Sequence, residues 1–304
     1  MKYVITGGAG FIGSHLAEAL AMDHEVVVID DLFSGKQENI AHIPVKFVEG
    51  SVTDFSLLKQ IFEGSDGIFH EAAITSVPRS VKDPLPTNET NITGTLNVLL
   101  AAKEMNVRKV VFASSSSVYG DTPVLPKTEN MPLNPMSPYG VSKLTGEQYC
   151  KIFSELYGLK TVSLRYFNVF GPRQDPQSEY SAVIPKFITR ILKNESPVIY
   201  GDGKQTRDFT YVKDVVQANI KAMESNIEGI FNVAYNQQIS LISLASLIME
   251  LTGLTVPILF EPERPGDIRD SLADISCIQN QIGYNPQYSV KSGLMETIKW
   301  YQSH

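Results

Sequence analysis

The segment that most constrains this fold is a glycine-rich turn near the start of the chain. Residues 6–13 read Thr-Gly-Gly-Ala-Gly-Phe-Ile-Gly and follow an apolar run at 3–6. The spacing of Gly7, Gly10 and Gly13 lets a chain turn tightly, approach a pyrophosphate and pack a helix against a strand. The helix predicted at 12–21 would direct its amino terminus at the phosphates. A turn that only needs a positive φ angle is the alternative for this segment alone.

An aspartate ends the second apolar run, residues 25–29. A carboxylate at this point accepts hydrogen bonds from both hydroxyls of an adenosine ribose and repels a 2′-phosphate. Asp30 therefore favours NAD over NADP. A strand-terminal aspartate that merely caps a turn is the alternative.

Short apolar runs alternate with helix-period segments through the first half of the chain, a pattern typical of βαβ units. The expected strands are 3–6, 25–29, 46–48, 67–70, 110–113 and 161–164. We predict an α/β fold with a Rossmann-type doubly wound parallel sheet. Turn-rich sequence after Phe170 indicates a smaller C-terminal α/β domain. We divide the chain into a dinucleotide-binding domain, 1–168, and a substrate domain, 169–304, with a segment around 231–234 returning to the first.

A tyrosine and a lysine lie one helical turn apart in the middle of the chain. Ser137 and Pro138 are typical of a helix start and Gly158 of a helix end. Tyr139 and Lys143 would then share one helix face. A lysine ammonium beside a phenol lowers the pKa of the phenol toward the range of a general base. A packed tyrosine with a solvated lysine is the alternative when the pattern stands alone.

Four consecutive serines follow the predicted strand 110–113; they are Ser114, Ser115, Ser116 and Ser117. Ligands of doubly wound folds bind at the carboxyl ends of the strands, so these hydroxyls are placed for a ligand. One of them could bridge Tyr139 and a substrate hydroxyl. A polar loop without a chemical role is the alternative.

Composition narrows the classes of partner. The 304 residues are 43% hydrophobic and 19% charged, as in an ordinary globular protein. A formal net charge of -7 argues against nucleic acid, because binding phosphates needs an excess of Lys and Arg. No apolar run is long enough for a membrane helix. Cys150 and Cys277 form neither a disulfide framework nor a metal cluster, so we expect a cytoplasmic protein without a metal site.

Together these motifs are similar to those of the extended short-chain dehydrogenase/reductases, and specifically of the nucleotide-sugar 4-epimerases. The sequence most resembles their UDP-N-acetylglucosamine 4-epimerase branch. The segments that carry the closer match are residues 76–80, 164–171, 174–176, 182–186, 201–203, 207–209, 265–267 and 271–274. The resemblance covers essentially the whole chain.

The resemblance implies NAD as the cofactor. The residues that would bind it are Gly7, Gly10, Phe11, Ile12, Gly13, Asp30, Asp31, Leu32, Phe33, Ser34, Gly35, Ser51, Val52, Ala72, Ala73, Thr75, Asn91, Ser114, Tyr139, Lys143 and Phe167. Ser51 and Val52 would flank the adenine, and Ser51 stands where the family usually has Asp. Tyr139, Lys143 and Ser115 would be the catalytic residues.

It also implies a UDP-sugar substrate. The residues that would bind it are Ser76, Ser115, Ser116, Ser117, Tyr139, Asn168, Gln174, Ala182, Val183, Tyr200, Arg207, Arg264, Asp267 and Ser271. Among these, Asn168, Arg207 and Arg264 would hold the pyrophosphate. Asp267 would contact the uridine ribose, and Tyr200 would lie near the uracil. Ser271 stands where family members restricted to non-acetylated sugars tend to carry a bulky tyrosine.

The function these features imply is an NAD-dependent 4-epimerase. It would interconvert UDP-N-acetylglucosamine and UDP-N-acetylgalactosamine, and UDP-glucose and UDP-galactose, through a 4-keto sugar with Tyr139 as base. A UDP-glucuronate 4-epimerase or decarboxylase of the same fold is the alternative. A 4,6-dehydratase would need acidic residues at 116 and 117, and a non-enzymatic NAD sensor would be expected to lose Tyr139 or Lys143.

The resemblance also implies a homodimer. Family members pair two helices, here expected around 91–105 and 139–157, with the same helices of a second subunit. These segments carry apolar residues on more than one face; they include Leu96, Leu99, Leu100, Phe153 and Leu156. Two helices that only cover the sheet are the alternative on pattern alone.

Overall fold

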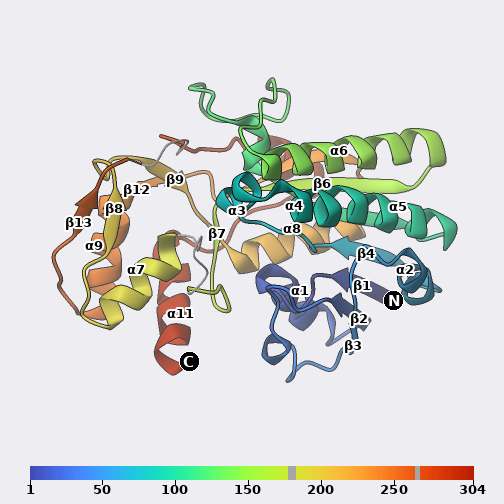
Figure 1. The fold of residues 1–304 in the computed structure, drawn as a ribbon, viewed down its shortest axis with the longest axis horizontal. Coiled ribbons are helices and arrows are strands. Elements are labelled where there is room, and N and C mark those ends of the chain that lie inside the picture. Colours follow the sequence, from blue (N-terminus) through green and yellow to red (C-terminus); the bar gives the residue numbers. More distant parts are fainter. Residues whose placement is uncertain (177–182, 264–267) are drawn as a thin grey trace.

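A seven-stranded sheet forms the centre of the protein (Figure 1). The computed structural model describes residues 1–176, 183–263 and 268–304. The strand order is β11-β6-β5-β4-β1-β2-β3, and every neighbouring pair is parallel. The strands are β1 (Lys2–Thr6), β2 (Glu25–Asp30), β3 (Lys46–Glu49), β4 (Gly67–His70), β5 (Lys109–Ser115), β6 (Lys160–Tyr166) and β11 (Gly229–Val233). The doubly wound sheet and its six expected strands are confirmed.

Helices cover both faces of this sheet. One face carries α1 (Phe11–Leu20), α8 (Val212–Glu224) and α10 (Ser276–Ile282), and the other carries α2 (Phe55–Phe62), α5 (Gly94–Glu104) and α6 (Pro138–Tyr157). Successive strand side chains point to opposite faces, so neighbouring residues enter different cores. Val4 packs in the core beneath α5 and α6, whereas Ile5 packs in the core beneath α1 and α8.

Shorter helical segments lie near the carboxyl ends of the strands. They are the 3₁₀ segments Gln37–Asn39 and Ser116–Tyr119, the helices α3 (Val77–Lys82) and α4 (Pro84–Asn88), and a π-helical segment, Glu89–Thr93, that leads into α5. Irregular helix of this kind often occurs at functional sites.

The remaining elements form a second lobe with its own core, on the left in Figure 1. Its helices are α7 (Val183–Leu192), α9 (Leu241–Thr252) and α11 (Val290–Ser303). Its strands pair two by two: β7 (Val169–Phe170) with β10 (Thr210–Tyr211), β9 (Thr206–Asp208) with β12 (Gln238–Ser240), and β8 (Val198–Tyr200) with β13 (Leu259–Glu261).

The chain crosses between the two lobes more than once. Strand β11 lies in the central sheet and pairs with β6. Helix α8 also packs on the sheet, against α1. The division into a dinucleotide-binding domain and a substrate domain at residue 168 therefore stays a prediction. No helix in the described ranges is both long and apolar enough to cross a membrane.

Helices α5 and α6 lie side by side over the sheet (Figure 1). Leu99 and Phe153 are 0% and 4% exposed and pack against the strands. Val141, Ile152 and Leu156 are 47%, 42% and 67% exposed on the outer side of α6. Helix α6 is therefore apolar on more than one face, as the sequence predicts.

A buried ion pair joins α6 to β6 beneath the serine segment. Arg165 donates to both carboxylate oxygens of Glu147 at 2.8 Å, and the two side chains are 1% and 0% exposed. Ser114 Oγ donates to Glu147 at 2.5 Å, and the third Arg165 nitrogen, Nη1, donates to Tyr119 Oη at 2.8 Å. Tyr119 in turn donates to Asn232 on β11 at 2.6 Å. The network fixes the end of β5 relative to α6, β6 and β11.

We expect Glu147→Gln to lower the free energy of unfolding by about 3–5 kcal/mol, because it leaves the Arg165 charge buried without its partner. Glu155 on the same helix pairs with Lys151 at 3.8 Å, with both side chains more than half exposed. Glu155→Gln should therefore cost about 1 kcal/mol or less. Denaturant unfolding of the two variants tests this, and equal small losses would contradict it.

Candidate functional site

The glycine-rich turn forms a cradle of bare backbone between β1 and α1. Gly7 has φ +69°, and its N–H donates to Ile29 O at 2.8 Å. A Cβ atom on Gly7 would lie 2.7 Å from Ala72 Cα, and one on Gly13 would collide with Gly7 O. Close packing therefore requires glycine at both positions, and the backbone conformation requires it at position 7 as well. The amino terminus of α1 opens at the cradle, as a pyrophosphate site needs.

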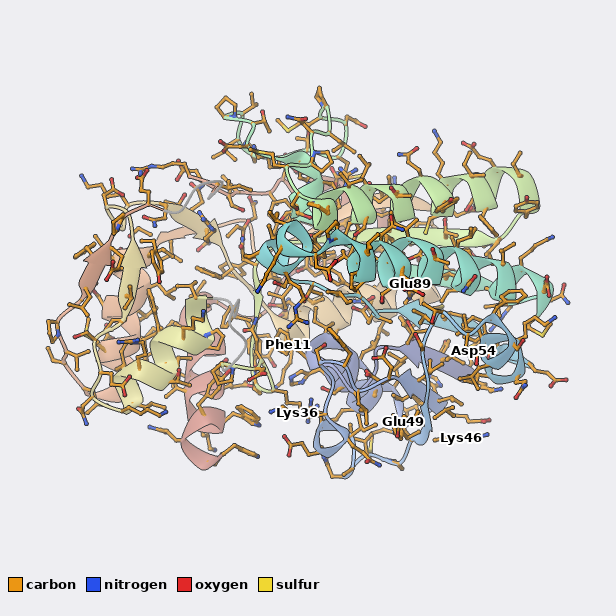
Figure 2. The ribbon with its side chains drawn as sticks, viewed as in Figure 1. Phe11, Lys36, Lys46, Glu49, Asp54 and Glu89 are labelled. Carbon is orange, nitrogen blue, oxygen red and sulfur yellow. The ribbon has the colours of Figure 1, made fainter. Side chains whose placement is uncertain are left out.

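A cleft of about 610 Å³ opens beside this turn. Residues expected to bind NAD line it; they are Gly7, Gly10, Phe11, Ile12, Gly13, Asp30, Asp31, Phe33, Ser34, Val52, Ala72, Ala73 and Thr75. Figure 2 labels three lining residues, Phe11, Lys36 and Glu89, which come from α1, the loop after β2 and the segment before α5. Ser76 and Gln174, expected at the substrate, line this cleft too, and Gln174 also donates to Val169 O at 3.2 Å.

Asp30 is held at the end of β2 by backbone donors. Its two carboxylate oxygens accept hydrogen bonds from Ala9 N at 3.0 Å and Leu32 N at 2.9 Å. Burial raises the pKa of Asp30, and these N–H groups act in the opposite direction. A Cβ on Gly35 would lie 2.7 Å from the carboxylate, so the loop closes tightly over it. The carboxylate is thus fixed in the cleft where the sequence places a ribose partner.

Six further residues expected at the cofactor are not among those that line this cleft; they are Leu32, Gly35, Ser51, Asn91, Ser114 and Phe167. Asn91 is buried, accepts from Ile74 N at 2.8 Å and donates to Ser142 Oγ at 3.0 Å. Ser51 Oγ accepts from Thr53 N at 3.3 Å and so organises a turn. Phe167 is 1% exposed in the core. Of these contacts, the one from Asn91 reaches a lining residue of the cleft, Ile74.

Helix α6 and the end of β5 bring the three expected catalytic residues together. Ser137 Oγ accepts from Gly140 N at 3.1 Å and Gly158 ends the helix in the left-handed conformation, so both predicted helix ends are confirmed. A hydrogen bond links Tyr139 and Ser115, and Lys143 Nζ lies 5.9 Å from the centre of the Tyr139 ring.

The expected effect of Lys143 on Tyr139 is wrong for this structure. Burial raises the pKa of the Tyr139 phenol, and the Glu71 carboxylate adds to the rise, while the hydrogen bond with Ser115 lowers it. Lys143 Nζ donates to Ala113 O at 2.7 Å. Its own pKa is lowered to about 8 by burial. Loss of hydration at the phenolate is therefore the largest influence on its pKa, and a sequence pattern cannot reveal such burial.

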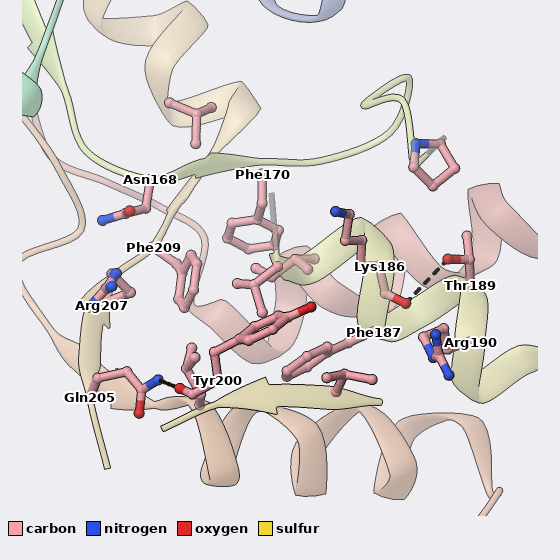
Figure 3. A pocket seen from close by; sticks show the side chains of 16 residues that line it. Asn168, Phe170, Lys186, Phe187, Thr189, Arg190, Tyr200, Gln205, Arg207 and Phe209 are labelled. Atoms are coloured by element: carbon pink, nitrogen blue, oxygen red, sulfur yellow. Dashed lines mark hydrogen bonds between the residues drawn. The ribbon is translucent and has the colours of Figure 1, made fainter. Parts of the chain in front are cut away.

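A second cavity, of about 530 Å³, lies in the other lobe between α7 and the strands β7, β8 and β9 (Figure 3). Four residues expected at the substrate line it: Asn168, Val183, Tyr200 and Arg207. Figure 3 shows the rings of Phe187, Tyr200 and Phe209 between Arg207 on one side and Lys186 and Arg190 on the other.

Sequence reasoning missed two cations of this cavity. Lys186 and Arg190 lie four residues apart and face the cavity from α7. Their spacing puts them on one side of a helix, and that signal could have found them. Arg190 Nε also donates to Ser196 O at 2.6 Å, which holds the side chain against the next turn of chain.

Ser271 lies beside the cavity. Asn168 Nδ2 donates to Ser271 Oγ at 3.3 Å and to Asp208 O at 3.0 Å. Ser271 N donates to Thr206 O at 3.2 Å, so the loop is tied to β9. The expected substrate residues Ala182, Arg264 and Asp267 lie outside the described residues.

The serine segment is ordered by local hydrogen bonds. Ser115 Oγ accepts from Ser117 N at 3.2 Å at the start of the 3₁₀ segment. Ser116 is partly exposed. Among the described residues, the Ser117 hydroxyl is a buried group without a recorded partner. A buried hydroxyl of this kind is suited to meet a polar ligand.

We expect Asp30→Asn to weaken the preference for NAD over NADP by about tenfold or more, because it removes the charge that repels a 2′-phosphate. Asparagine keeps an oxygen for one of the two backbone donors. Calorimetric titration of the cofactor-free protein with both dinucleotides measures the ratio. An unchanged ratio would show that Asp30 does not select the cofactor, as would NADP as the main nucleotide that copurifies with the wild type.

Comparison with known proteins places the chain in a family. Residues 3–234 match the model of the NAD dependent epimerase/dehydratase family. A putative UDP-glucose 4-epimerase of Methanocaldococcus jannaschii is 38% identical over 304 residues, which cover 99% of this chain and 98% of the relative.

Two solved structures are close to this one. A UDP-N-acetylglucosamine 4-epimerase from Methanobrevibacter ruminantium M1, in complex with UDP-N-acetylmuramic acid, has a TM-score of 0.97 and 46% identity and covers 99% of this chain and 98% of its own. A UDP-glucuronic acid 4-epimerase from Bacillus cereus, in complex with UDP-glucuronic acid and NAD, has a TM-score of 0.93 and 32% identity and covers 100% and 99%. The chain therefore belongs to the NAD dependent epimerase/dehydratase family of extended short-chain dehydrogenase/reductases, and its cofactor is NAD.

Proposed function

We propose that this protein interconverts UDP-N-acetylglucosamine and UDP-N-acetylgalactosamine, and also UDP-glucose and UDP-galactose. The observation that carries the proposal is the meeting of Tyr139, Ser115 and Lys143 beside the dinucleotide cleft. The relative whose complex contains UDP-N-acetylmuramic acid supports an N-acetylated UDP-sugar as substrate. Ser271, which accepts a hydrogen bond from Asn168, is small where family members restricted to non-acetylated sugars tend to carry tyrosine, and it would leave room for the acetyl group.

The protein's part in this reaction is to handle a proton and hold two ligands. NAD, when bound, supplies the hydride acceptor for the sugar C4 and the donor that returns it. Tyr139 takes the proton of the 4-hydroxyl and later returns it, and Ser115 bridges the phenol and that hydroxyl. The 4-keto sugar must rotate between the two hydride transfers, so that the returning hydride reaches the other face of C4.

The cavity of the second lobe would hold the UDP group while the sugar turns. Arg207, Lys186 and Arg190 supply positive charge for the two phosphates. The rings of Tyr200 and Phe187 offer flat apolar surfaces for the uracil. Firm contacts to UDP together with a loose sugar pocket would allow both faces of C4 to be presented.

A UDP-glucuronate 4-epimerase is the second candidate. The relative from Bacillus cereus acts on that substrate, and the buried Ser117 hydroxyl would suit a sugar carboxylate. A decarboxylase is less consistent with the chain, because Ser117 stands where those enzymes typically carry Glu. The two epimerase candidates differ in substrate and are separated by the same assay.

Incubation of the purified protein with UDP-N-acetylglucosamine, UDP-glucose and UDP-glucuronate, followed by identification of the products, tests the proposal. We expect 4-epimers of the first two. Tyr139→Phe should lower turnover about 10²–10⁴-fold, the usual contribution of a positioned acid–base group, with little change in substrate affinity. Product from UDP-glucuronate alone would favour the second candidate. Near-normal turnover of the phenylalanine variant would exclude Tyr139 as the base.

We expect Ser271→Tyr to remove activity on the N-acetylated sugar selectively. The ring would fill the space beside Asn168, and overfilling typically costs about 1–3 kcal/mol, or about 5- to 150-fold in affinity. Ser271→Ala is the matched control: it removes the hydrogen bond from Asn168 without filling the space, so any loss should be equal for the two sugars. Comparison of kcat/KM for UDP-N-acetylglucosamine and UDP-glucose gives the answer. Equal losses on both sugars, or none, would mean that Ser271 does not select sugar size.

We also propose a homodimer through α5 and α6. The exposed side chains of Val141, Ile152 and Leu156 form an apolar strip on the outer side of α6, which pairing of the helices would bury. Light scattering at micromolar concentration should give the mass of two chains, and Leu156→Asp should shift it toward one. Glu155→Gln, a polar change on the same helix, should leave the mass unchanged. A monomeric wild type would refute this proposal.

A further inference from the structure

Asp208, at the end of β9, is a buried carboxylate to which the proposed reaction gives no role. Its side chain is 0% exposed. Its two neighbours, Arg207 and Phe209, line the second cavity (Figure 3). Because successive side chains of an extended chain point to opposite sides, Asp208 points away from that cavity. Burial of an unpaired charge is costly, so the carboxylate must be met by donors from other segments.

The donors are backbone N–H groups of two loops that are distant in sequence. Tyr235 N, just after β11, donates to Asp208 Oδ1 at 3.2 Å, and Ala273 N, just before α10, donates to Oδ2 at 3.1 Å. Burial raises the pKa of Asp208 to about 6, and these two N–H groups act to lower it, as do those of Asn236 and Gln237. One side chain thus joins β9 to both loops.

The loop that contains Ala273 also carries Ser271. The Ser271 N–H donates to Thr206 O at 3.2 Å, and the loop runs parallel to β9. Two hydrogen bonds, two residues apart on each segment, therefore fix the register of this loop along the strand. Asn168 Nδ2 donates both to Asp208 O at 3.0 Å and to Ser271 Oγ at 3.3 Å. A slip of the loop by one residue would turn the Ser271 side chain away from Asn168.

Asp214 shows the same chemistry away from the candidate substrate residues. It lies in the first turn of α8 and is 1% exposed, and its two oxygens accept from Gln287 N at 2.7 Å and Tyr288 N at 3.1 Å. Burial raises its pKa as well. The segments that Asp214 joins carry none of the residues expected at the substrate. Asp214 therefore provides a matched control for what such a carboxylate contributes to stability alone.

We propose that Asp208 is a positioning residue that holds the Ser271 loop against Asn168 and so shapes the site for the UDP-sugar. This rests on the proposed function, because it takes Ser271 and Asn168 as residues that meet the substrate. Asp208→Asn keeps the size of the side chain but replaces one acceptor oxygen with a donor NH₂ group. Either Ala273 N or Tyr235 N then loses its acceptor, and the loop is no longer held to β9 at both points.

The effect should fall on binding, because the expected catalytic residues lie on α6 and β5 in the other lobe. In Asp208→Asn we expect the Kd for UDP and the KM for UDP-N-acetylglucosamine to rise about tenfold or more, with kcat changed by less than about threefold. Asp214→Asn should lose a similar amount of stability in denaturant unfolding and keep the wild-type Kd and KM.

Calorimetric titration of the full chain, with its bound cofactor, with UDP at pH 8 measures the Kd without turnover, and steady-state kinetics give KM and kcat. A merely structural role would leave less folded enzyme, which lowers the apparent kcat and leaves KM and Kd unchanged. If Asp208→Asn does not fold, Asp208→Ser provides the second test, because its hydroxyl can accept from one N–H without placing a second donor against the other.

Unchanged Kd and KM in the Asp208 variant would overturn the proposal, as would equal rises in the Asp208 and Asp214 variants or a fall in kcat alone. Failure of the proposed function is a distinct result. A wild-type protein that binds no UDP would refute that function and this role of Asp208 with it. A wild type and an Asp208 variant that bind UDP equally well would refute only the role of Asp208.

Discussion

The site depends on one close contact, that of the Gly7 backbone with Ala72 after β4. A side chain at position 7 would lie 2.7 Å from Ala72 Cα, so the ends of β1 and β4 approach as closely as backbone allows. This contact brings the end of β4, and with it Glu71, next to the glycine turn that lines the dinucleotide cleft. Because all seven strands are parallel, their carboxyl ends meet at the same edge, and Ser115 joins these groups from β5.

Two pairs of charged residues lie near this edge of the sheet, and they differ in what they do. Glu147 and Arg165 are joined by two hydrogen bonds of 2.8 Å and hold β5, β6 and α6 together. Glu71 and Lys143 form no hydrogen bond with each other in the described part of the chain, and burial moves the pKa of each toward neutrality. The first pair is structural. The second lies beside the phenol that the proposed reaction uses, where a change of proton affinity alters chemistry.

Much of the fold could be predicted from sequence because its signals are local. The apolar runs predicted six strands. Ser137, Pro138 and Gly158 predicted the ends of α6, because helix ends depend on short-range hydrogen bonds and backbone conformation. The resemblance to epimerases identified the family. The pKa of Tyr139 could not be predicted, because its direction depends on burial by segments distant in sequence. The hydrogen bond between Tyr166 and Glu71 could not be predicted for the same reason, since the two residues are distant in sequence and meet only in the folded chain.

The most direct test of the proposed reaction follows a label at the sugar C4. UDP-N-acetylglucosamine carrying deuterium at C4 is incubated with the purified protein, and the UDP-N-acetylgalactosamine formed is analysed by mass spectrometry. We expect the product to keep the deuterium at C4, because the hydride is stored on a tightly held cofactor and returned to the same sugar. Loss of the deuterium to water, or failure to form the 4-epimer from any UDP-sugar, would contradict the account.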